Sequence, residues 1–450
     1  MKSSHLSKTQ MAKKPRRLKG FEDFFARDMK IREFVIDTFK HVFEKYGYEP
    51  LETPALELTE LMLDQSGEEA EKQFYRFTDP GGRDVMLRYE VMIAMCRAVG
   101  EHLNILTFPY KRYQIQRCWR AENTQKGRYR EFTQCDADTI GSTSMLCDAE
   151  YIQMGLEVVE TLGFTDYIAR ISNRKFLEGY AEQIGLAQDC FYGFCMSLDK
   201  IKKIGPSAVV DEMVNRRGIP EKSAQQALRD LNPERYEGMD FADIIKEAGV
   251  LVGDSVVGQE GLGELAQIEE YLSSVGVDKK RYSFDTSLAR GLASYTGPVW
   301  EFEVIDGNVG SIAGCGRYDR AIGAYVGKEI PAAGGSFGIE RICDILKERE
   351  MVAFDESPAH VLVTLFDANT WKNSLQTANV LRGAGISVML YPDVCPLRKQ
   401  FKYASSKEIP WVIVIGPEEI KQKVVQVKNM STGEQKAVSE AGLADMIGTV

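Results

Sequence analysis

The stretch RCWRAENTQKGRYREFTQCDADTIG, residues 117–141, gathers charged side chains in a way that suggests ligand chemistry. Its first fourteen residues include four arginines, and two aspartates, Asp136 and Asp138, lie near its end. A guanidinium group binds phosphate or carboxylate through two parallel hydrogen bonds, and carboxylates attract cationic groups. This order of charges therefore suits a ligand with a polyanionic end and a cationic end.

The same stretch has the alternation of a β-hairpin. Side chains of a strand point alternately to opposite faces, so the even positions of 112–122 and 128–138, which are mostly polar, would share one face. The arginines would lie at the loop end, with Gln134 and Asp138 about 13 Å farther along at roughly 3.3 Å per residue. A solvated sheet with cross-strand ion pairs would give the same pattern, so the hairpin alone leaves both interpretations open.

Two glycine-rich segments are further candidates for an anion site. They are GSIAGCGRYD at 310–319 and AAGGSFGIERI at 332–342, and neither matches the phosphate-binding patterns GxxxxGK[ST] or GxGxxG. Each contains an arginine, Arg317 or Arg341. Gly338 opens a predicted helix whose first turn would favour an anion, although a tight turn with close backbone packing explains the glycines equally well.

The elements that must position these residues fall into regions of different pattern. Residues 31–46 place apolar side chains at helical spacing, with Gly47 as the predicted stop. Residues 172–281 are mostly helical and richly charged, and strand and glycine patterns return at 284–345. A linker is predicted at 347–360, and after it strands alternate with helices, which predicts a small α/β domain with a largely parallel sheet.

The composition is that of an ordinary folded chain, and its 450 residues suggest two to four domains. No run approaches 18 apolar residues, so no membrane span is expected, and the basic N-terminus lacks the apolar core of a secretory signal. The nine cysteines are scattered, which predicts no metal site and suggests a reducing, cytoplasmic setting. A net charge of −10 argues against indiscriminate nucleic-acid binding but allows a local basic face.

The order of the motifs resembles a class II aminoacyl-tRNA synthetase, specifically the histidyl-tRNA synthetase family. The helix leading to Pro54 resembles motif 1, CWRAENTQKGRYREF resembles motif 2, and GGSFGIERI resembles motif 3. RG..YTGP, which contains Arg290, and GRYD are similar to the two histidine-family signatures. LRKQFKYASSKEIPWVIVIG is similar to the family's anticodon-binding domain, and the HIGH and KMSKS motifs of the other synthetase class are absent.

The resemblance covers about residues 18–450 and implies an α+β fold. Its catalytic core would be the class II antiparallel sheet with a helical insertion, followed by a C-terminal α/β anticodon-binding domain. The implied domains are a disordered tail at 1–17, the catalytic domain at 18–171 and 282–347, the insertion at 172–281 and the anticodon-binding domain at 356–450.

The implied reaction is ATP-dependent activation of histidine to histidyl-adenylate, followed by transfer to tRNA(His). Arg120 would hold the α-phosphate and the amino-acid carboxylate, and Glu122 would approach the adenine. Arg128 and Arg341 would bind the outer phosphates, and Arg290 would stabilise charge at the α-phosphorus. ATP would arrive with Mg²⁺ held mostly by its phosphates, with no metal site in the protein.

The resemblance also implies where histidine, tRNA and a second copy of the chain would bind. The substrate ammonium would meet Glu90, Gln134 and Asp138, and the imidazole would meet Tyr295 and Tyr318. The tRNA would meet cations in PLRKQFKY, namely Arg398, Lys399 and Lys402, although a solvated helix has the same pattern. The apolar stripe of residues 31–46 and the Pro54 segment would form a homodimer interface, the alternative being a core helix.

The amino-acid pocket departs from the family pattern. Met92 stands where the family usually has threonine, Ala293 and Ser294 where it has Asp-Tyr, and Cys315 where it has glycine. A pocket that hydrogen-bonds a polar ligand loses much when a partner is missing. Three hypotheses therefore remain: a histidine–tRNA ligase, a paralogue for another amino acid or acceptor, and a non-catalytic subunit of ATP phosphoribosyltransferase. The C-terminal domain argues against the last.

Overall fold

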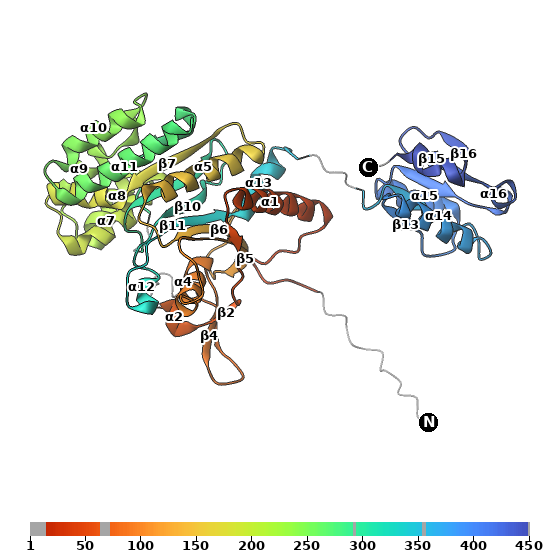
Figure 1. Ribbon diagram of the computed structural model, residues 1–450, viewed down its shortest axis with the longest axis horizontal. Coiled ribbons are helices and arrows are strands. Elements are labelled where there is room, and N and C mark those ends of the chain that lie inside the picture. Colours follow the sequence, from red (N-terminus) through yellow and green to blue (C-terminus); the bar gives the residue numbers. More distant parts are fainter. Residues whose placement is uncertain (1–14, 64–72, 291–293, 353–356, 449–450) are drawn as a thin grey trace. The chain divides into compact units, whose positions relative to one another are not determined.

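The computed structural model describes residues 15–63, 73–290, 294–352 and 357–448 (Figure 1). Its contacts divide the chain into two compact units, Met1–Val352 and Ala353–Val450, and the division falls inside the linker predicted at 347–360. Most of the expected tail lies outside the described residues. Mixed helices and antiparallel-rich sheets confirm the predicted α+β class.

The first unit is built on an eight-stranded sheet with the order β1-β5-β6-β11-β10-β9-β7-β8. The β1–β5 and β7–β8 pairs are parallel, and the other neighbours are antiparallel. The bounds are β1 Glu49–Pro50, β5 Tyr110–Trp119, β6 Glu131–Ile140, β7 Tyr167–Asn173, β8 Tyr282–Phe284, β9 Pro298–Val304, β10 Ser311–Arg317 and β11 Ala332–Gly338.

Three helices cover one face of this sheet: α1 Ala26–Lys45, α5 Met145–Thr161 and α13 Ile339–Glu348 (Figure 1). The apolar stripe of α1 is buried against the chain's own core, and the Phe39 ring lies 4.9 Å from that of Phe337 in β11. The predicted helix and its stop are confirmed, since Gly47 follows with φ of 79°. Packing within the chain therefore buries the stripe, as expected for a core helix, whereas Pro54 remains exposed.

A smaller three-stranded sheet, β2-β4-β3, lies beside the large one. Its strands are β2 Leu56–Leu58, β3 Arg76–Thr78 and β4 Asp84–Leu87, and the neighbouring helices are α2 Thr59–Leu63, α4 Val91–Glu101 and α12 Gly323–Val326. Helix α4 contacts β5 and β6, so it borders the face of the large sheet that α1 and α5 leave open.

Most of residues 172–281 is helical, as predicted, and these helices gather beyond the β7–β8 edge of the sheet (Figure 1). They are α6 Arg174–Gln183, α7 Phe191–Leu198, α8 Ile201–Arg217, α9 Glu221–Asp230, α10 Phe241–Val252 and α11 Val256–Ser274, with short 3₁₀ turns at Gln188–Cys190, Pro233–Tyr236 and Lys279–Arg281. Helix α8 is broken near its start, where Gly205 has φ of 79° and Pro206 follows.

The second unit is a five-stranded sheet with the order β13-β12-β14-β15-β16. The β12–β13 and β12–β14 pairs are parallel as predicted, but two antiparallel strands extend the sheet, so "largely parallel" was wrong for its second half. Its elements are β12 Val361–Val363, α14 Trp371–Gly383, β13 Val388–Leu390, α15 Leu397–Ser406, β14 Trp411–Val414, α16 Pro417–Gln422, β15 Val424–Asn429, β16 Gln435–Ser439, a 3₁₀ turn at Glu440–Gly442 and α17 Leu443–Ile447.

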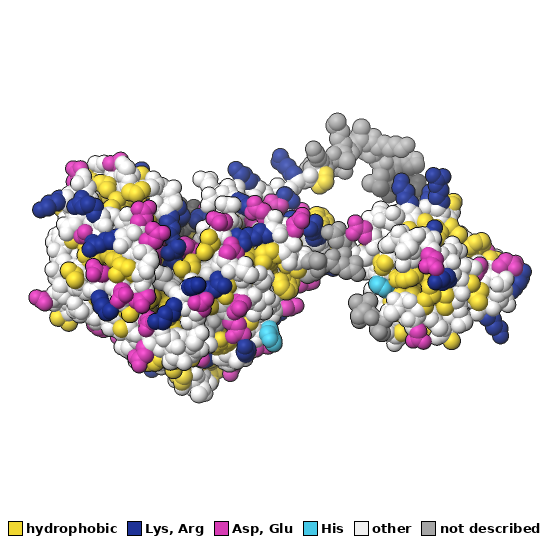
Figure 2. Space-filling model, turned by 90° about the horizontal axis from the view of Figure 1, so that it is seen from above, with side chains coloured by type: hydrophobic (Ala, Val, Ile, Leu, Met, Phe, Trp, Pro, Cys, Tyr) yellow, Lys and Arg dark blue, Asp and Glu magenta, His cyan; other side chains and the backbone are white. Residues whose placement is uncertain are grey.

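Acidic and basic side chains are interspersed over the face of the first unit seen in Figure 2, as the modest net charge suggests. Among the described residues, none of the helices combines the length and the apolar character that crossing a bilayer demands.

Candidate active site

The β5–β6 hairpin places the predicted polar residues on one face. Gln116 pairs with Gln134 and Arg112 pairs with Asp138, so the even positions of the two strands lie side by side. The strands end earlier than predicted, however, because β5 stops at Trp119 and β6 begins at Glu131. Arg120, Glu122 and Arg128 therefore belong to the connecting loop rather than to the strands.

A tight turn shapes the tip of this loop. The backbone N–H of Arg128 donates to the carbonyl of Gln125 at 2.9 Å, and Gly127 has φ of 67°. A Cβ on Gly127 would lie 2.9 Å from Cγ of Arg341, so only glycine lets the turn pack against that side chain. This contact brings motif 2 and motif 3 together. Arg128 also lies 3.4 Å from the Glu122 carboxylate.

Two of the arginines are positioned by main-chain carbonyls rather than by carboxylates. Arg120 donates from Nε to the carbonyl of Tyr89 at 2.9 Å, and its guanidinium carbon lies 5.0 Å from the centre of the Phe132 ring. Arg341, in the first turn of α13, donates to the carbonyl of Ser311 in β10. Their charges therefore remain available to an anionic ligand.

The electrostatics of Arg341 place the other arginines around it. Burial and the positive charges of Arg128, Arg290 and Arg120 together lower the pKa of Arg341 to about 10. The Glu122 carboxylate acts in the opposite direction. Such a concentration of like charges is unfavourable without an anion, so it favours a ligand such as a polyphosphate over the solvated-sheet interpretation.

Arg290 reaches this cluster across the β9–β10 pair. A Cβ on Gly314 of β10 would lie 2.0 Å from Nη2 of Arg290, so the guanidinium occupies the space that the glycine leaves. Its Nη1 lies 3.5 Å from the carboxylate of Glu301 in β9, and Arg174 donates to the Arg290 carbonyl at 3.3 Å. The glycine in GCGRYD therefore makes room for a side chain instead of binding phosphate with its backbone.

The other glycine-segment arginine, Arg317, does not join the cluster. It is buried and forms ion pairs with Asp148 at 2.5 Å and with Asp319 at 3.2 Å. The Arg317 guanidinium also donates hydrogen bonds to the carbonyls of Ser142 and Ser144. Arg317 therefore anchors the sheet to α5, and of the two glycine-segment arginines only Arg341 faces the candidate site.

At the other end of the hairpin, the charges are already paired. Arg112, with no exposed surface, forms an ion pair with Asp138, and the Tyr318 hydroxyl donates to the same carboxylate. Asp136 is buried on the same face, and its pKa is raised to about 7 because burial and the charge of Asp138 outweigh the opposing charge of Arg112. Asp138 is therefore not a free carboxylate for an ammonium, and Asp138 and Tyr318 form one hydrogen-bonded unit.

The remaining predicted amino-acid residues line the same face. Glu90, the N-cap of α4, is buried, and burial raises its pKa while the charge of Arg120 lowers it. Gln134 accepts from the backbone of Val91 at 3.0 Å. Tyr295 is buried, and its ring fills the space that Gly316 leaves. All three lie between the arginine cluster and the Asp138–Tyr318 unit.

The four residues that depart from the family pattern do not all border the pocket. Met92 is half-buried against the cluster that contains Tyr295 and Tyr318, so it does border the pocket. Cys315 points to the opposite face, because it is paired with Gly335 beneath Tyr151 of α5. Its assignment to the pocket was wrong, since strand alternation puts Gly314 and Gly316 there. Ser294 is half-buried, and Ala293 lies outside the described residues.

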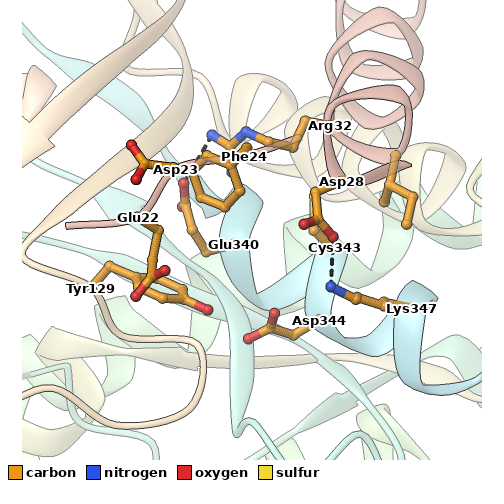
Figure 3. A pocket seen from close by; sticks show the side chains of 11 residues that line it. Glu22, Asp23, Phe24, Asp28, Arg32, Tyr129, Glu340, Cys343, Asp344 and Lys347 are labelled. Carbon is orange, nitrogen blue, oxygen red and sulfur yellow. Dashed lines mark hydrogen bonds and ion pairs between the residues drawn. The ribbon is translucent and has the colours of Figure 1, made fainter. Parts of the chain in front are cut away.

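A separate pocket of about 140 Å³ lies at the junction of the N-terminal segment, α1 and α13 (Figure 3). Its charged lining residues are mainly acidic, and its two cations are paired, Arg32 with Glu340 at 3.0 Å and Lys347 with Asp28 at 2.5 Å. Glu340 also accepts from the backbone of Thr133 at 2.9 Å. These contacts tie α1 and α13 to β6 and do not suit a polyanion.

In the second unit, the predicted tRNA-binding residues share an exposed helix. Arg398, Lys399 and Lys402 lie on α15 and are exposed, while Gln400 of the same helix is buried. Gln400 donates to the carbonyl of Leu365 at 2.8 Å and accepts from the N–H of the same residue at 2.9 Å. This fixes the helix on the sheet with its cations facing solvent.

Sequence reasoning assigned no role to Arg112 and Asp136, although both were placed on the correct face. The hairpin register could have predicted their pairing, because in an antiparallel hairpin with a known loop Arg112 lies opposite Asp138. What the register could not supply was Tyr318, which reaches Asp138 from 180 residues farther along the chain.

The geometry agrees with comparisons to known proteins. A family model described as histidyl-tRNA synthetase matches residues 20–342, and an anticodon binding domain model matches 360–449. The chain is 35% identical over 448 residues to a histidine–tRNA ligase of Cytophaga hutchinsonii, with 95% of this chain and 98% of that one covered. A histidine–tRNA ligase of Wolinella succinogenes is 36% identical over 426 residues, with 94% and 95% covered.

The fold is also similar to that of a solved structure from the same family. The crystal structure of histidyl-tRNA synthetase from Nostoc sp. PCC 7120 superimposes with a TM-score of 0.80 at 28% identity, covering 96% of this chain and 98% of that one. The antiparallel sheet and its three motifs define a class II aminoacyl-tRNA synthetase. Within that class, the chain belongs to the histidyl-tRNA synthetase family.

Proposed function

We propose that this chain is a histidine–tRNA ligase, which activates histidine with ATP and transfers it to tRNA(His). The observation that carries the proposal is the cluster of Arg120, Arg128, Arg290 and Arg341, brought together from three segments of the chain. Activation must bring a carboxylate against a triphosphate, and both are anionic. Preorganised cations offset that repulsion and stabilise the charge that develops at the reacting phosphorus.

In the activation step, a carboxylate oxygen of histidine attacks the α-phosphorus of ATP. The bond from the α-phosphorus to the oxygen that bridges to the β-phosphate breaks, and pyrophosphate leaves. Arg120 holds the α-phosphate and the attacking carboxylate, Arg290 stabilises the transition-state charge, and Arg128 and Arg341 bind the leaving pyrophosphate. The step needs positioning and electrostatics and no enzyme nucleophile. Mg²⁺ arrives on the phosphates of ATP.

The amino-acid subsite lies between the two ends of the polar face. Glu90 and Gln134 receive the ammonium of histidine, and Tyr295 and Tyr318 border the imidazole. Asp138 acts through Tyr318, because it accepts from the tyrosine hydroxyl and fixes its orientation. Met92 and Ser294 remove two polar contacts that the family usually has, so this subsite relies on the remaining partners.

The decisive experiment is ATP–pyrophosphate exchange with each proteinogenic amino acid. Histidine alone should support exchange, because the hydroxyls of Tyr295 and Tyr318 can hydrogen-bond an imidazole. Exchange with a different amino acid would establish the paralogue hypothesis instead. No exchange with any of them would favour a non-catalytic regulator, although the anticodon-binding match at 360–449 already argues against that alternative.

Transfer to tRNA requires the second unit, and we assign tRNA binding to Arg398, Lys399 and Lys402. Replacing all three by alanine in the full chain should weaken aminoacylation while leaving exchange unchanged, because these residues lie in a unit separate from the arginine cluster. Equal loss of both activities would mean that the domain only supports the catalytic unit.

The protein acts in the cytoplasm and as a homodimer in this proposal. Support for the dimer comes from the small sheet, where Leu56, Leu58 and Phe77 share one face and are 45%, 39% and 46% exposed. An apolar face of this kind is typical of interaction surfaces. Light scattering should give about twice the 50.6 kDa mass of one chain, and a single monomeric species would exclude the dimer.

A further inference from the structure

The carboxylate of Glu301, in β9, is buried beside Arg290 of the arginine cluster. Its Oε2 atom lies 3.5 Å from Nη1 of Arg290. In the sheet register Glu301 lies opposite Gly314 of β10, and the Arg290 guanidinium occupies the space that this glycine leaves. The two members of one cross-strand pair therefore place the guanidinium, Gly314 by leaving room for it and Glu301 by attracting its charge.

The other oxygen of the same carboxylate contacts the helical region. Oε1 of Glu301 lies 3.3 Å from Nζ of Lys202, at the start of α8, and the lysine also pairs with Glu303 of β9 at 2.5 Å. Burial raises the pKa of Glu301, and the charges of Arg290 and Lys202 oppose that rise. Lys202 therefore holds the oxygen that Arg290 does not contact and helps to keep the carboxylate ionised.

The contact with Glu301 leaves Arg290 able to bind an anion. A charge-assisted hydrogen bond between a guanidinium and a carboxylate is usually about 2.7–2.9 Å long, so the contact at 3.5 Å is a loose one. A guanidinium has five N–H donors, and Nε of Arg290 is buried with no hydrogen-bond partner in the described part of the chain. Glu301 thus fixes the position of the guanidinium without occupying its donors.

We propose that Glu301 is a positioning residue for Arg290: its carboxylate holds the guanidinium over Gly314, and Lys202 holds the carboxylate from the helical region. The inference rests on the proposed function, because it takes Arg290 as the arginine that stabilises charge at the α-phosphorus. The alternative is that Glu301 only ties the helical region to the sheet through Lys202, as Glu303 does. A tie of that kind affects stability, whereas positioning affects the rate through Arg290.

The test is a double-mutant cycle on histidine-dependent ATP–pyrophosphate exchange by the full chain. Glu301→Gln keeps the shape of the side chain and removes its charge, so kcat should fall roughly tenfold because the guanidinium is less well placed. The KM values for ATP and histidine should stay within about twofold, because the contact of Arg290 with the α-phosphorus matters in the transition state. Arg290→Ala should be slower still.

The double variant decides whether Glu301 acts through Arg290. If it does, Glu301→Gln combined with Arg290→Ala should exchange at the rate of Arg290→Ala alone, within about twofold, because the arginine that Glu301 positions is already gone. Rate losses that multiply in the double variant would overturn the inference. So would a kcat for Glu301→Gln within about twofold of the unchanged protein.

Glu303→Gln is the matched control, because it lies on the same strand and also loses an ion pair with Lys202. Both variants should show comparable falls in melting temperature, and only Glu301→Gln should lose rate. Equal rate losses in the two variants would mean that the tie to the helical region matters and would overturn the positioning role. If Glu301→Gln does not fold, Glu301→Asp, which keeps the charge and shortens the side chain by one carbon, replaces it with the same expectations.

The outcomes also separate this inference from the proposed function. If the unchanged protein exchanges with histidine and Arg290→Ala is slow while Glu301→Gln is normal, the ligase assignment stands and the positioning role is overturned. If the unchanged protein exchanges with no amino acid, the ligase assignment fails. The crystal structure of Glu301→Gln then decides the positioning role, which stands if the Arg290 guanidinium has left Gly314 and is overturned if it has not moved.

Discussion

At one end of the β5–β6 hairpin Arg112 lies fully buried between Asp138 and Tyr318, and at the other end Arg120 and Arg128 lie in a loop beside Arg290 and Arg341. Both ends of the hairpin carry arginines, on a strand at one end and in the connecting loop at the other. The first arginine has a carboxylate partner inside the protein, whereas the loop-end cluster has far more positive charge than neighbouring carboxylates can balance. A fully buried arginine with a carboxylate partner stabilises the fold, whereas a group of arginines that outnumbers its carboxylate partners can bind an anionic ligand.

The comparison predicts opposite costs for removing an arginine from each end. Arg112→Leu should lower the free energy of unfolding by about 3–5 kcal/mol, because it leaves the Asp138 carboxylate buried and unpaired. Denaturant unfolding measures this. Arg117→Leu is the control on the same strand, since its pair with Glu131 is 62% exposed on the arginine side and should contribute less than about 1 kcal/mol. Similar losses for both variants would contradict the comparison.

At the loop end, the loss should appear in activity instead of stability. Arg120→Ala and Arg290→Ala should each slow histidine-dependent exchange roughly 10²–10³-fold, because each removes a preorganised charge at the α-phosphate. Their unfolding free energies should change by no more than about 1 kcal/mol. Arg83→Ala, which breaks an exposed pair with Asp79, should leave exchange intact. Near-normal exchange in either active-site variant would show that its assignment is mistaken.

Asp136 sharpens the comparison through pH. Its pKa is raised from 3.8 to about 7 by burial, so the folded protein holds a proton there that the unfolded chain releases. Below about pH 4 the carboxyl group is protonated in both states, so the raised pKa does not change the free energy of unfolding. As the pH rises toward 7 the free energy of unfolding falls progressively, and above that pH the loss is complete. Asp136→Asn should therefore gain stability over the unchanged protein by about 2–3 kcal/mol more at pH 8 than at pH 5.

Thermal or denaturant unfolding at these two pH values tests the effect of Asp136. The matched variant is Asp84→Asn, whose carboxylate is exposed and has a lowered pKa because it accepts from Arg76. It should show no gain at pH 8 relative to pH 5. A pH-independent difference for Asp136→Asn would mean that its carboxyl group titrates normally in the folded protein.

The smallest expected effect concerns the loop-end ion pair. Glu122→Gln should change the free energy of unfolding by less than about 1 kcal/mol, because a partly exposed pair with 3.4 Å separation contributes little. The same variant should raise the KM for ATP, since Glu122 is assigned to the adenine. A large loss of stability with normal ATP binding would place this pair with the structural end of the hairpin instead.

The predictable part of the site is the part that local patterns encode. Period-two alternation predicted the hairpin and its polar face, and the spacing of Ile31, Val35 and Phe39 predicted α1. The strand ends were misplaced because Arg120 and Arg128 continue the alternation in sequence, while the turn at Gly127 ends the ladder. Cys315 was assigned to the wrong face because its segment was taken as a motif and not as a strand.

The sequence by itself determined the residue types, the hairpin and the order of motifs, and from these the family and the arginines proposed to bind ATP. Only the tertiary structure decided which charges are paired. Arg317 and Arg341 follow similar glycine segments, yet Arg317 meets Asp148 of α5, while Arg341 meets other arginines. Which charged side chains form ion pairs depends on contacts between distant segments, and a local sequence pattern does not predict those contacts.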